Sequence, residues 1–160
     1  MSSATDGVRF EVVDPADAEA TAAMTAYFAE LDVRFPGGFD ASGALGPGAS
    51  SMGAPDGAFV LARGGDGLVA GCGGVQRHDS TTAEIKRMWI APHARGAGLG
   101  KRLLAELERV CRGLGYTQVV LDTNATLTEA IAMYESVGYS SIARYNDNPY
   151  AQRWFTKPLL

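Results

Sequence analysis

Apolar positions along the chain switch repeatedly between a spacing of two residues, typical of strands, and a spacing of three to four, typical of helices. Their order predicts strand, helix, three strands, long helix, strand, short helix and two closing strands, which favours a mixed sheet with helices on both faces. The expected strands span residues 8–13, 58–62, 68–76, 83–90, 119–121, 139–145 and 153–157.

The expected helices have recognisable ends. The first runs from Pro15 to about residue 31, and the second carries its leucines on one face from residue 99 to 114 before Gly115 ends it. Thr126 and Glu129 have the spacing of a capping box, in which each side chain binds a backbone N–H at the helix start. They therefore predict the start of the short helix.

Residues 35–57 are dominated by Gly, Ala, Ser and Pro. Such a composition disfavours both helix and strand, so we expect a long mobile segment without regular structure. Long segments of this kind are usually binding loops or disordered.

Length and charge narrow the class of protein. A chain of 160 residues, of which 46% are hydrophobic, suits a single domain over residues 1–160. The net charge of -4 argues against nucleic acid or an anionic membrane as a partner. No apolar run is long enough to span a membrane, and the N-terminus has no signal-peptide pattern. Cys72 and Cys111 have no metal-ligand spacing, so we expect buried, reduced thiols, no metal and a cytoplasmic location.

The most informative local motif is the glycine-rich run Arg95-Gly96-Ala97-Gly98-Leu99-Gly100-Lys101, which follows a strand and begins a helix. Glycines let the backbone approach a ligand closely, and the free N–H groups of the first helical turn attract a phosphate. Arg95 and Lys101 add positive charge there. The run therefore predicts a pyrophosphate site, although a glycine-rich turn that only starts a helix is the alternative.

Two known phosphate motifs do not fit this run. The Walker pattern needs glycine at position 95 and Ser or Thr at position 102, where the chain has two arginines. A dinucleotide fingerprint needs its third glycine at position 101 and a place near the start of the fold.

Three motifs together resemble the GNAT superfamily of N-acetyltransferases. Residues 95–100 match its signature Gln/Arg-x-x-Gly-x-Gly/Ala, residues 83–90 resemble its central fourth strand, and residues 130–139 resemble its tyrosine-bearing helix. The order and separations also match from residue 58 to the end. Residues 146–157 resemble a mostly uncharacterised bacterial subgroup.

The resemblance implies a mixed, mostly antiparallel sheet of six or seven strands in which the fourth and fifth strands splay apart to hold acetyl-CoA. The family usually has an asparagine where this chain has Leu127, and Asn124 is the candidate replacement. The cofactor-binding residues that the resemblance implies are Met88, Trp89, Ile90, Arg95, Gly96, Ala97, Gly98, Leu99, Gly100, Lys101 and Asn124.

The family also implies catalytic roles. Tyr134 stands where the family has its general acid, beside the sulfur of the cofactor. Glu84 and Asp122 stand at the positions of the base in two different branches, and solvent is a third possible base. Strand alternation predicts that Glu84 shares a face with Met88 and Ile90 and points to the cleft, the alternative being a solvated carboxylate.

The expected acceptor is a primary amine of a small molecule, and the acidic chain slightly favours a cationic one. The first helix and the segment after it supply the candidate substrate-binding residues Tyr27, Arg34, Phe35 and Phe39, with Arg34 suited to a substrate carboxylate. A protein N-terminus or lysine as acceptor, a CoA-binding module without catalysis and a nucleotide binder are the alternatives. The resemblance also leaves a homodimer open.

Overall fold

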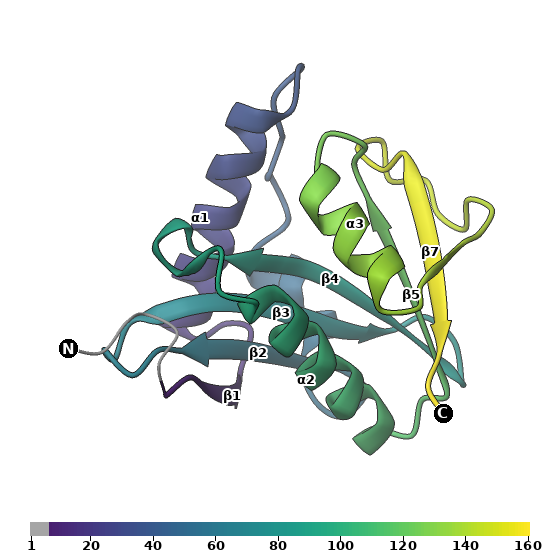
Figure 1. Cartoon of the computed structure of the whole chain (residues 1–160), viewed down its shortest axis with the longest axis horizontal. Helices are drawn as coiled ribbons and strands as arrows, with labels where there is room; N and C mark the ends of the chain where they lie inside the picture. Colours follow the sequence, from purple (N-terminus) through teal and green to yellow (C-terminus); the bar gives the residue numbers. More distant parts are fainter. Residues whose placement is uncertain (1–6) are drawn as a thin grey trace.

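A seven-stranded sheet runs through the computed structural model, which describes residues 7–160 (Figure 1). The strand order is β1-β2-β3-β4-β5-β7-β6, and every neighbouring pair is antiparallel except β4 and β5. This confirms the expected mixed, mostly antiparallel sheet. The strands are β1 (Arg9–Val13), β2 (Ala58–Arg63), β3 (Val69–Arg77), β4 (Thr82–Ile90), β5 (Gln118–Thr123), β6 (Ser140–Ser141) and β7 (Arg153–Pro158).

Helices cover both faces of the sheet, as the sequence predicts. Helix α1 (Ala18–Arg34) packs on one face, and helices α2 (Leu99–Gly113) and α3 (Thr128–Ser136) pack on the other (Figure 1). Cys72 is buried in the α1 core and Cys111 in the α2 core, as expected. Among residues 7–160, no helix combines the length and apolar character needed to cross a membrane.

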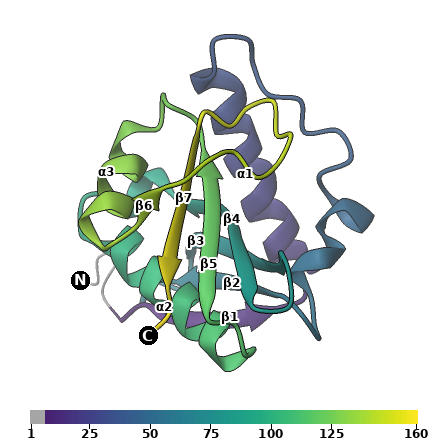
Figure 2. The same ribbon diagram turned by 90° about the vertical axis from the view of Figure 1, so that its right-hand side faces the viewer.

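Strands β4 and β5 separate soon after they meet. They pair only from Thr82 opposite Gln118 to Glu84 opposite Val120, although β4 continues to Ile90 and β5 to Thr123. Beyond the paired residues β5 stays with β7, and the strands diverge (Figure 2). The predicted splay of the fourth and fifth strands is therefore present, with α1 and α3 on its two sides.

A β-bulge in β4 overturns the predicted strand alternation. The register with β3 shifts between Cys72 and Gly74, and Arg87 has the positive φ of 56°. The extra residue moves Met88 and Ile90 to the α2 face, whereas the residues before the bulge keep their original alternation. Glu84 therefore does not share a face with Met88 and Ile90.

The segment of residues 35–57 contains regular structure, contrary to expectation. Residues Gly46–Met52 form a 3₁₀ helix, η1, and Ala49 and Met52 on it are each 1% exposed. Their spacing of three residues matches the three residues per turn of a 3₁₀ helix, so both side chains point into the α1 core. Burial of these two side chains stabilises a segment whose composition alone disfavours helix.

The predicted capping box of α3 is wrong. The N-cap residue is Leu127, which has no side-chain capping bond. Thr126 instead donates its hydroxyl to Asn124 Oδ1 at 2.8 Å, and Glu129 forms an ion pair with Arg34 of α1 at 2.7 Å. Thr126 is thus held by a local turn contact and Glu129 by a tertiary ion pair, and the capping-box pattern reveals neither.

The strand expected over residues 139–145 is also wrong in length, because β6 has only two residues. Beyond it the chain leaves the sheet, and the Tyr145 hydroxyl donates to Glu84 at 2.6 Å. Asn146 then donates to Asp122 at 2.6 Å. These polar contacts replace the ladder bonds that a longer strand would have made.

Leu107→Ala tests the core beneath α2. Leu107 is 0% exposed, so the substitution leaves a cavity and should lower the free energy of unfolding by about 2–5 kcal/mol. Denaturant unfolding followed by circular dichroism measures the change. Leu68→Ala is the matched control, because Leu68 is 59% exposed and should change stability by less than about 0.5 kcal/mol. Equal losses in both variants would contradict the assigned core.

Candidate active site

Two adjoining cavities open where β4 and β5 part. One, of about 290 Å³, is lined by the glycine loop together with α1, β4 and α3, and we call it the loop cavity. The other, of about 350 Å³, is lined by aromatic residues of α1 and its following segment, by β4 and by the loop before β7, and we call it the aromatic cavity. Both are lined by Tyr27, Leu31, Met88, Leu127, Ala130 and Tyr134.

The glycine loop presents the start of α2 to the loop cavity. Gly96 and Gly98 have φ angles of 87° and 78°, a region that other residues rarely adopt, and a Cβ at either would meet nothing within 4 Å. The first N–H of α2 to bond within the helix is that of Arg102, to Gly98 O at 3.3 Å. The preceding N–H groups of the first turn, with the helix dipole behind them, are therefore available to an anion.

The edge of β4 supplies backbone groups to the same cavity. Ala91 donates its N–H to Ala70 O at 2.8 Å, and because successive strand residues point their backbone groups to opposite sides, those of Ile90 face the gap. The Ile90 carbonyl indeed accepts a bond from Arg95 Nε at 2.9 Å rather than from a strand. An extended ligand could take the place that a paired strand would occupy.

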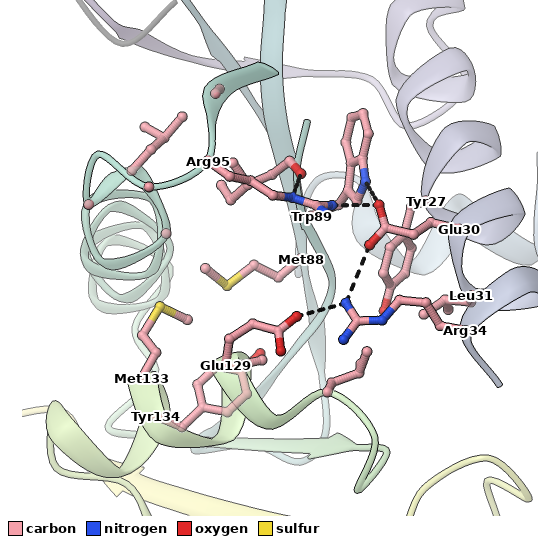
Figure 3. A pocket seen from close by; sticks show the side chains of 18 residues that line it. Tyr27, Glu30, Leu31, Arg34, Met88, Trp89, Arg95, Glu129, Met133 and Tyr134 are labelled. Carbon is pink, nitrogen blue, oxygen red and sulfur yellow. Dashed lines mark hydrogen bonds and ion pairs between the residues drawn. The ribbon is translucent and has the colours of Figure 1, made fainter. Parts of the chain in front are cut away.

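A network of four charged side chains lines the loop cavity (Figure 3). Glu30 of α1 accepts from Arg95 at 2.5 Å and lies 3.5 Å from Arg34, which also pairs with Glu129 of α3 at 2.7 Å. The hydrogen bond from Arg34 lowers the pKa of Glu129 and correspondingly raises the pKa of Arg34. The network connects the two helices that flank the splay.

Tyr134 lies at the junction of the two cavities. Helix α3 directs its ring against Tyr139 and Phe155, with centroids 5.7 and 6.0 Å away, and the side chain is buried. Burial raises the pKa of Tyr134 to about 12, so the phenol keeps its proton at neutral pH. Within residues 7–160 its hydroxyl has no hydrogen-bond partner, yet every fully buried side-chain oxygen there does. The hydroxyl is therefore accessible from the cavities.

Asp122 lines the aromatic cavity at the end of β5. Its carboxylate accepts hydrogen bonds from Asn146 at 2.6 Å and from Asn148 at 3.3 Å. Burial raises the pKa of Asp122 above the ordinary range of an aspartate, although the bond from Asn146 opposes the shift. A carboxylate with a raised pKa, held in a cavity beside Tyr134, has the properties of a general base.

Glu84, the other candidate base, lines neither cavity. It is only 7% exposed, so the solvated alternative is wrong as well, and it accepts bonds from Gln76 at 2.7 Å and Tyr145 at 2.6 Å. Gln76 in turn accepts a bond from Ser51 of η1. Glu84 therefore connects β4 with β3 and with the segment that contains Tyr145, and Gln76 extends these contacts to η1.

The remaining predicted residues divide between the two cavities. Phe35 and Phe39 line the aromatic cavity, as does Asn124, whose amide is engaged with Tyr150 O and Thr126. Arg34 lines the loop cavity instead. Ala97 and Lys101 are exposed and line neither. The predicted cofactor residues brought together at the loop cavity are Met88, Trp89, Ile90, Arg95, Gly96, Gly98, Leu99 and Gly100.

Sequence reasoning missed several lining residues. Glu30 lies one helical turn from both Tyr27 and Arg34, so the helical spacing of α1 contained the signal. Arg87 could not be found in this way, because the bulge that directs it toward α1 has no signature in the pattern of β4. Asn148 belongs to the motif of residues 146–157, but nothing in that motif indicates its contact to Asp122.

Residues 25–139, more than half of the chain, match the model of the acetyltransferase (GNAT) family. The chain belongs to the GNAT family. The match covers the glycine loop, the splayed strands and Tyr134.

Curated relatives agree over part of their length. An uncharacterized N-acetyltransferase of Schizosaccharomyces pombe is 36% identical over 98 residues, which is 61% of this chain and 60% of that protein. An IAA acetyltransferase of Azospirillum brasilense is 36% identical over 87 residues, or 54% of this chain and 56% of the relative. The chain thus matches little more than half of the length of these relatives.

Solved structures share the fold of this GNAT chain at low identity. A GNAT-family acetyltransferase from Staphylococcus aureus Mu50 has a TM-score of 0.80 at 16% identity, with 96% of this chain and 100% of that one covered. N-acetylglutamate synthase from Neisseria gonorrhoeae, complexed with coenzyme A and L-arginine, has a TM-score of 0.66 at 15% identity, with 96% and 34% covered. At these identities the likeness shows the fold alone.

Gly98→Asp and Gly98→Asn test whether the start of α2 binds phosphate. Asp and Asn have nearly equal size and both tolerate positive φ, so the variants differ only in charge at the site. Near the phosphates the carboxylate should repel the ligand, so the dissociation constant of coenzyme A should be about tenfold or more higher in Gly98→Asp than in Gly98→Asn. Isothermal titration calorimetry measures both. Equal affinities would place the phosphates elsewhere.

Proposed function

We propose that this GNAT protein is an acetyl-CoA-dependent N-acetyltransferase in which cofactor and amine occupy the two adjoining cavities and meet at Tyr134. The observation that carries the proposal is the position of the Tyr134 hydroxyl. It is protonated, unpaired within residues 7–160 and accessible at the junction of a cavity suited to phosphates and a cavity suited to an acceptor.

The residues of the loop cavity fit coenzyme A. The first-turn N–H groups of α2 would hold the pyrophosphate, and the outward-facing groups of Met88 and Ile90 on β4 would hold the pantetheine amides. Bound acetyl-CoA supplies the thioester from which the acetyl group is transferred. Arg95 now bonds Ile90 O and Glu30, so its guanidinium would have to release the β4 carbonyl to let the arm pair there.

Two side chains divide the proton transfers. Tyr134 donates its phenolic proton to the departing thiolate sulfur, a role that its high pKa suits because the proton is present at neutral pH. Asp122 accepts a proton from the ammonium form of the acceptor or from a water beside it. A base must be deprotonated to act, so the raised pKa of Asp122 predicts that kcat/KM declines as pH falls through that pKa.

The aromatic cavity favours a small molecule as acceptor. Phe39 and Tyr150 line it with ring centroids 4.6 Å apart, and the Asp40 N–H donates to the Tyr150 hydroxyl at 2.9 Å. The cavity of about 350 Å³ is thus bounded by large rings and suits an acceptor of small-molecule size. The location of the protein in the cytoplasm and its oligomeric state stay predictions.

The proposal is tested by thiol release from acetyl-CoA in the presence of a library of small amines, with mass spectrometry of the acetylated products. We expect acetyl transfer to at least one primary amine. Binding of coenzyme A without transfer to any amine, peptide N-terminus or lysine would instead support a CoA-binding module without catalysis.

Tyr134→Phe removes the proposed acid and little else. Turnover should fall about 10²-fold or more, because general acid catalysis contributes that much, while calorimetry should find nearly unchanged affinity for acetyl-CoA. Tyr139→Phe is the matched control, since the Tyr139 hydroxyl donates to Glu108 and its residue lines neither cavity. Unchanged turnover of Tyr134→Phe across pH would remove Tyr134 from the mechanism.

Asp122→Asn and Glu84→Gln separate the two candidate bases. Asp122→Asn should lower kcat/KM about 10²-fold and remove the inflection at the pKa of Asp122, leaving only the acid-side decline due to protonation of the acceptor amine itself. Glu84→Gln can still accept the bond from Gln76 at its amide oxygen and can donate its NH2 to the Tyr145 hydroxyl, so it should keep both the rate and the profile. The reverse result would assign the base to Glu84, and unchanged profiles in both variants would assign proton removal to solvent.

A further inference from the structure

The aromatic cavity contains an excess of positive charge. Lys86 and Arg87 both line it, and within residues 7–160 neither has a carboxylate within 4.0 Å. Among residues 7–160, Asp122 is the only carboxylate in the lining; two asparagines hydrogen-bond to it, and burial disfavours its ionisation. A ligand that fills this cavity therefore meets two cations for one carboxylate.

Arg87 is held in place without an anion. Its Nη1 donates to Ala44 O at 2.7 Å and contacts Met24 Sδ at 3.4 Å, and its guanidinium lies 5.4 Å from the centre of the Phe28 ring. Nε and Nη2 bond no atom of residues 7–160. Because every fully buried side-chain nitrogen in that range has a partner, these two groups are accessible. They are the donors that a ligand in the aromatic cavity can reach.

Three other arginines at or near the sheet, in contrast, have carboxylate partners. Arg63 pairs with Glu11 and Glu19, and Arg34 and Arg95 each pair with Glu30. Burial lowers the pKa of Arg87, whereas hydrogen bonds to carboxylates raise the pKa of Arg63 and of Arg34. A half-buried guanidinium without a counter-charge is unfavourable alone, and an anionic ligand would compensate it.

The rest of the aromatic cavity suits an apolar body. The rings of Phe28 and Phe39 stack with centroids 5.3 Å apart, and Tyr150 lies 5.8 Å from Phe35. Flat apolar groups pack well against such surfaces. The cavity volume of about 350 Å³ is large enough for a molecule the size of an aromatic amino acid.

We infer that the acceptor is a small amine that also carries a carboxylate and an apolar or aromatic group, such as a free amino acid, and that Arg87, assisted by Lys86, binds the carboxylate. The inference rests on the proposed acetyl transfer and names its acceptor class. Asp122 and Tyr134 then lie on the side of the amine. The carboxylate site at Arg87 replaces the one expected at Arg34, because Arg34 lines the other cavity and already pairs with Glu30 and Glu129.

The same charges disfavour the cationic acceptors that the acidic composition suggested. A polyamine would bring further positive charge beside Lys86 and Arg87. The N-terminus of a protein would bring an amide carbonyl in place of the carboxylate, and so would lose the charge-assisted bonds. The aromatic cavity is thus locally positive, although the whole chain has a net charge of -4.

Two matched pairs of acceptors test the inference on the complete protein. The first pair is L-phenylalanine and L-phenylalaninamide, and the second is 4-(aminomethyl)benzoate and benzylamine. The two acids differ in the spacing between the amine and the carboxylate. In at least one pair the carboxylate should raise kcat/KM at least about tenfold, as expected for a charge-assisted bond in a desolvated site. No preference for the carboxylate in either pair would overturn the inference.

Arg87→Met locates the site. The methionine retains apolar contact with Phe28 but removes the charge, so the preference for the carboxylate should fall to within about threefold while the affinity for coenzyme A stays unchanged. Arg153→Met is the matched control, because Arg153 also lies over a phenylalanine, 4.9 Å from the centre of Phe155, but lines neither cavity. If Arg87→Met fails to fold, Lys86→Met should reduce the preference by a smaller factor. A retained preference in the folded Arg87→Met protein would overturn the assignment.

A binding measurement distinguishes this inference from the proposed function. Calorimetry on protein saturated with coenzyme A compares the affinity for each carboxylate with that for its uncharged partner. Selective binding of a carboxylate by a protein that transfers acetyl to no amine, peptide N-terminus or lysine would support the carboxylate site and overturn the proposed acetyltransferase. Acetyl transfer with equal binding and turnover of both partners would support the acetyltransferase and overturn the carboxylate site.

Discussion

Backbone N–H and C=O groups at a strand edge need hydrogen-bond partners. The candidate site of this GNAT protein lies where β4 and β5 no longer hydrogen-bond to each other. The two strands pair over three residues and then part, although each continues as a strand with its other neighbour. The outward-facing groups of Ile90 are left to a side chain, and α1 and α3 stand on either side of the gap. Both cavities follow from this one failure of pairing.

The bulge at Arg87 is the second constraint, and it sorts the residues of β4 between the cavities. Before the bulge, Glu84 lies on the α1 face among Gln76 and Tyr145. After it, Met88 and Ile90 lie on the α2 face, beside the glycine loop, while Arg87 itself is directed toward α1. The extra residue thus brings Arg87 to the α1 side, where Glu84 also lies, and turns Met88 and Ile90 to the α2 side.

Within residues 7–160, charged side chains form ion pairs with one another around the loop cavity but not in the aromatic cavity. Around the loop cavity Glu30, Glu129, Arg34 and Arg95 neutralise one another, leaving the anion-binding potential to the start of α2. In the aromatic cavity Arg87 keeps free donors. The division matches a ligand with phosphates on one side and a ligand with a carboxylate on the other, and Tyr134 lies where the two would meet.

The sequence by itself determined the order of the elements, the mixed sheet, the glycine loop and the family, because periodicity and short motifs are local properties of the chain. It also placed Tyr134 through the motif of its helix. Only the tertiary structure decided where Glu84, Arg34 and Arg87 lie and what they contact. A bulge shifts the face of every residue after it, and ion pairs such as Arg34 with Glu129 join segments whose separation in the sequence carries no periodic signal.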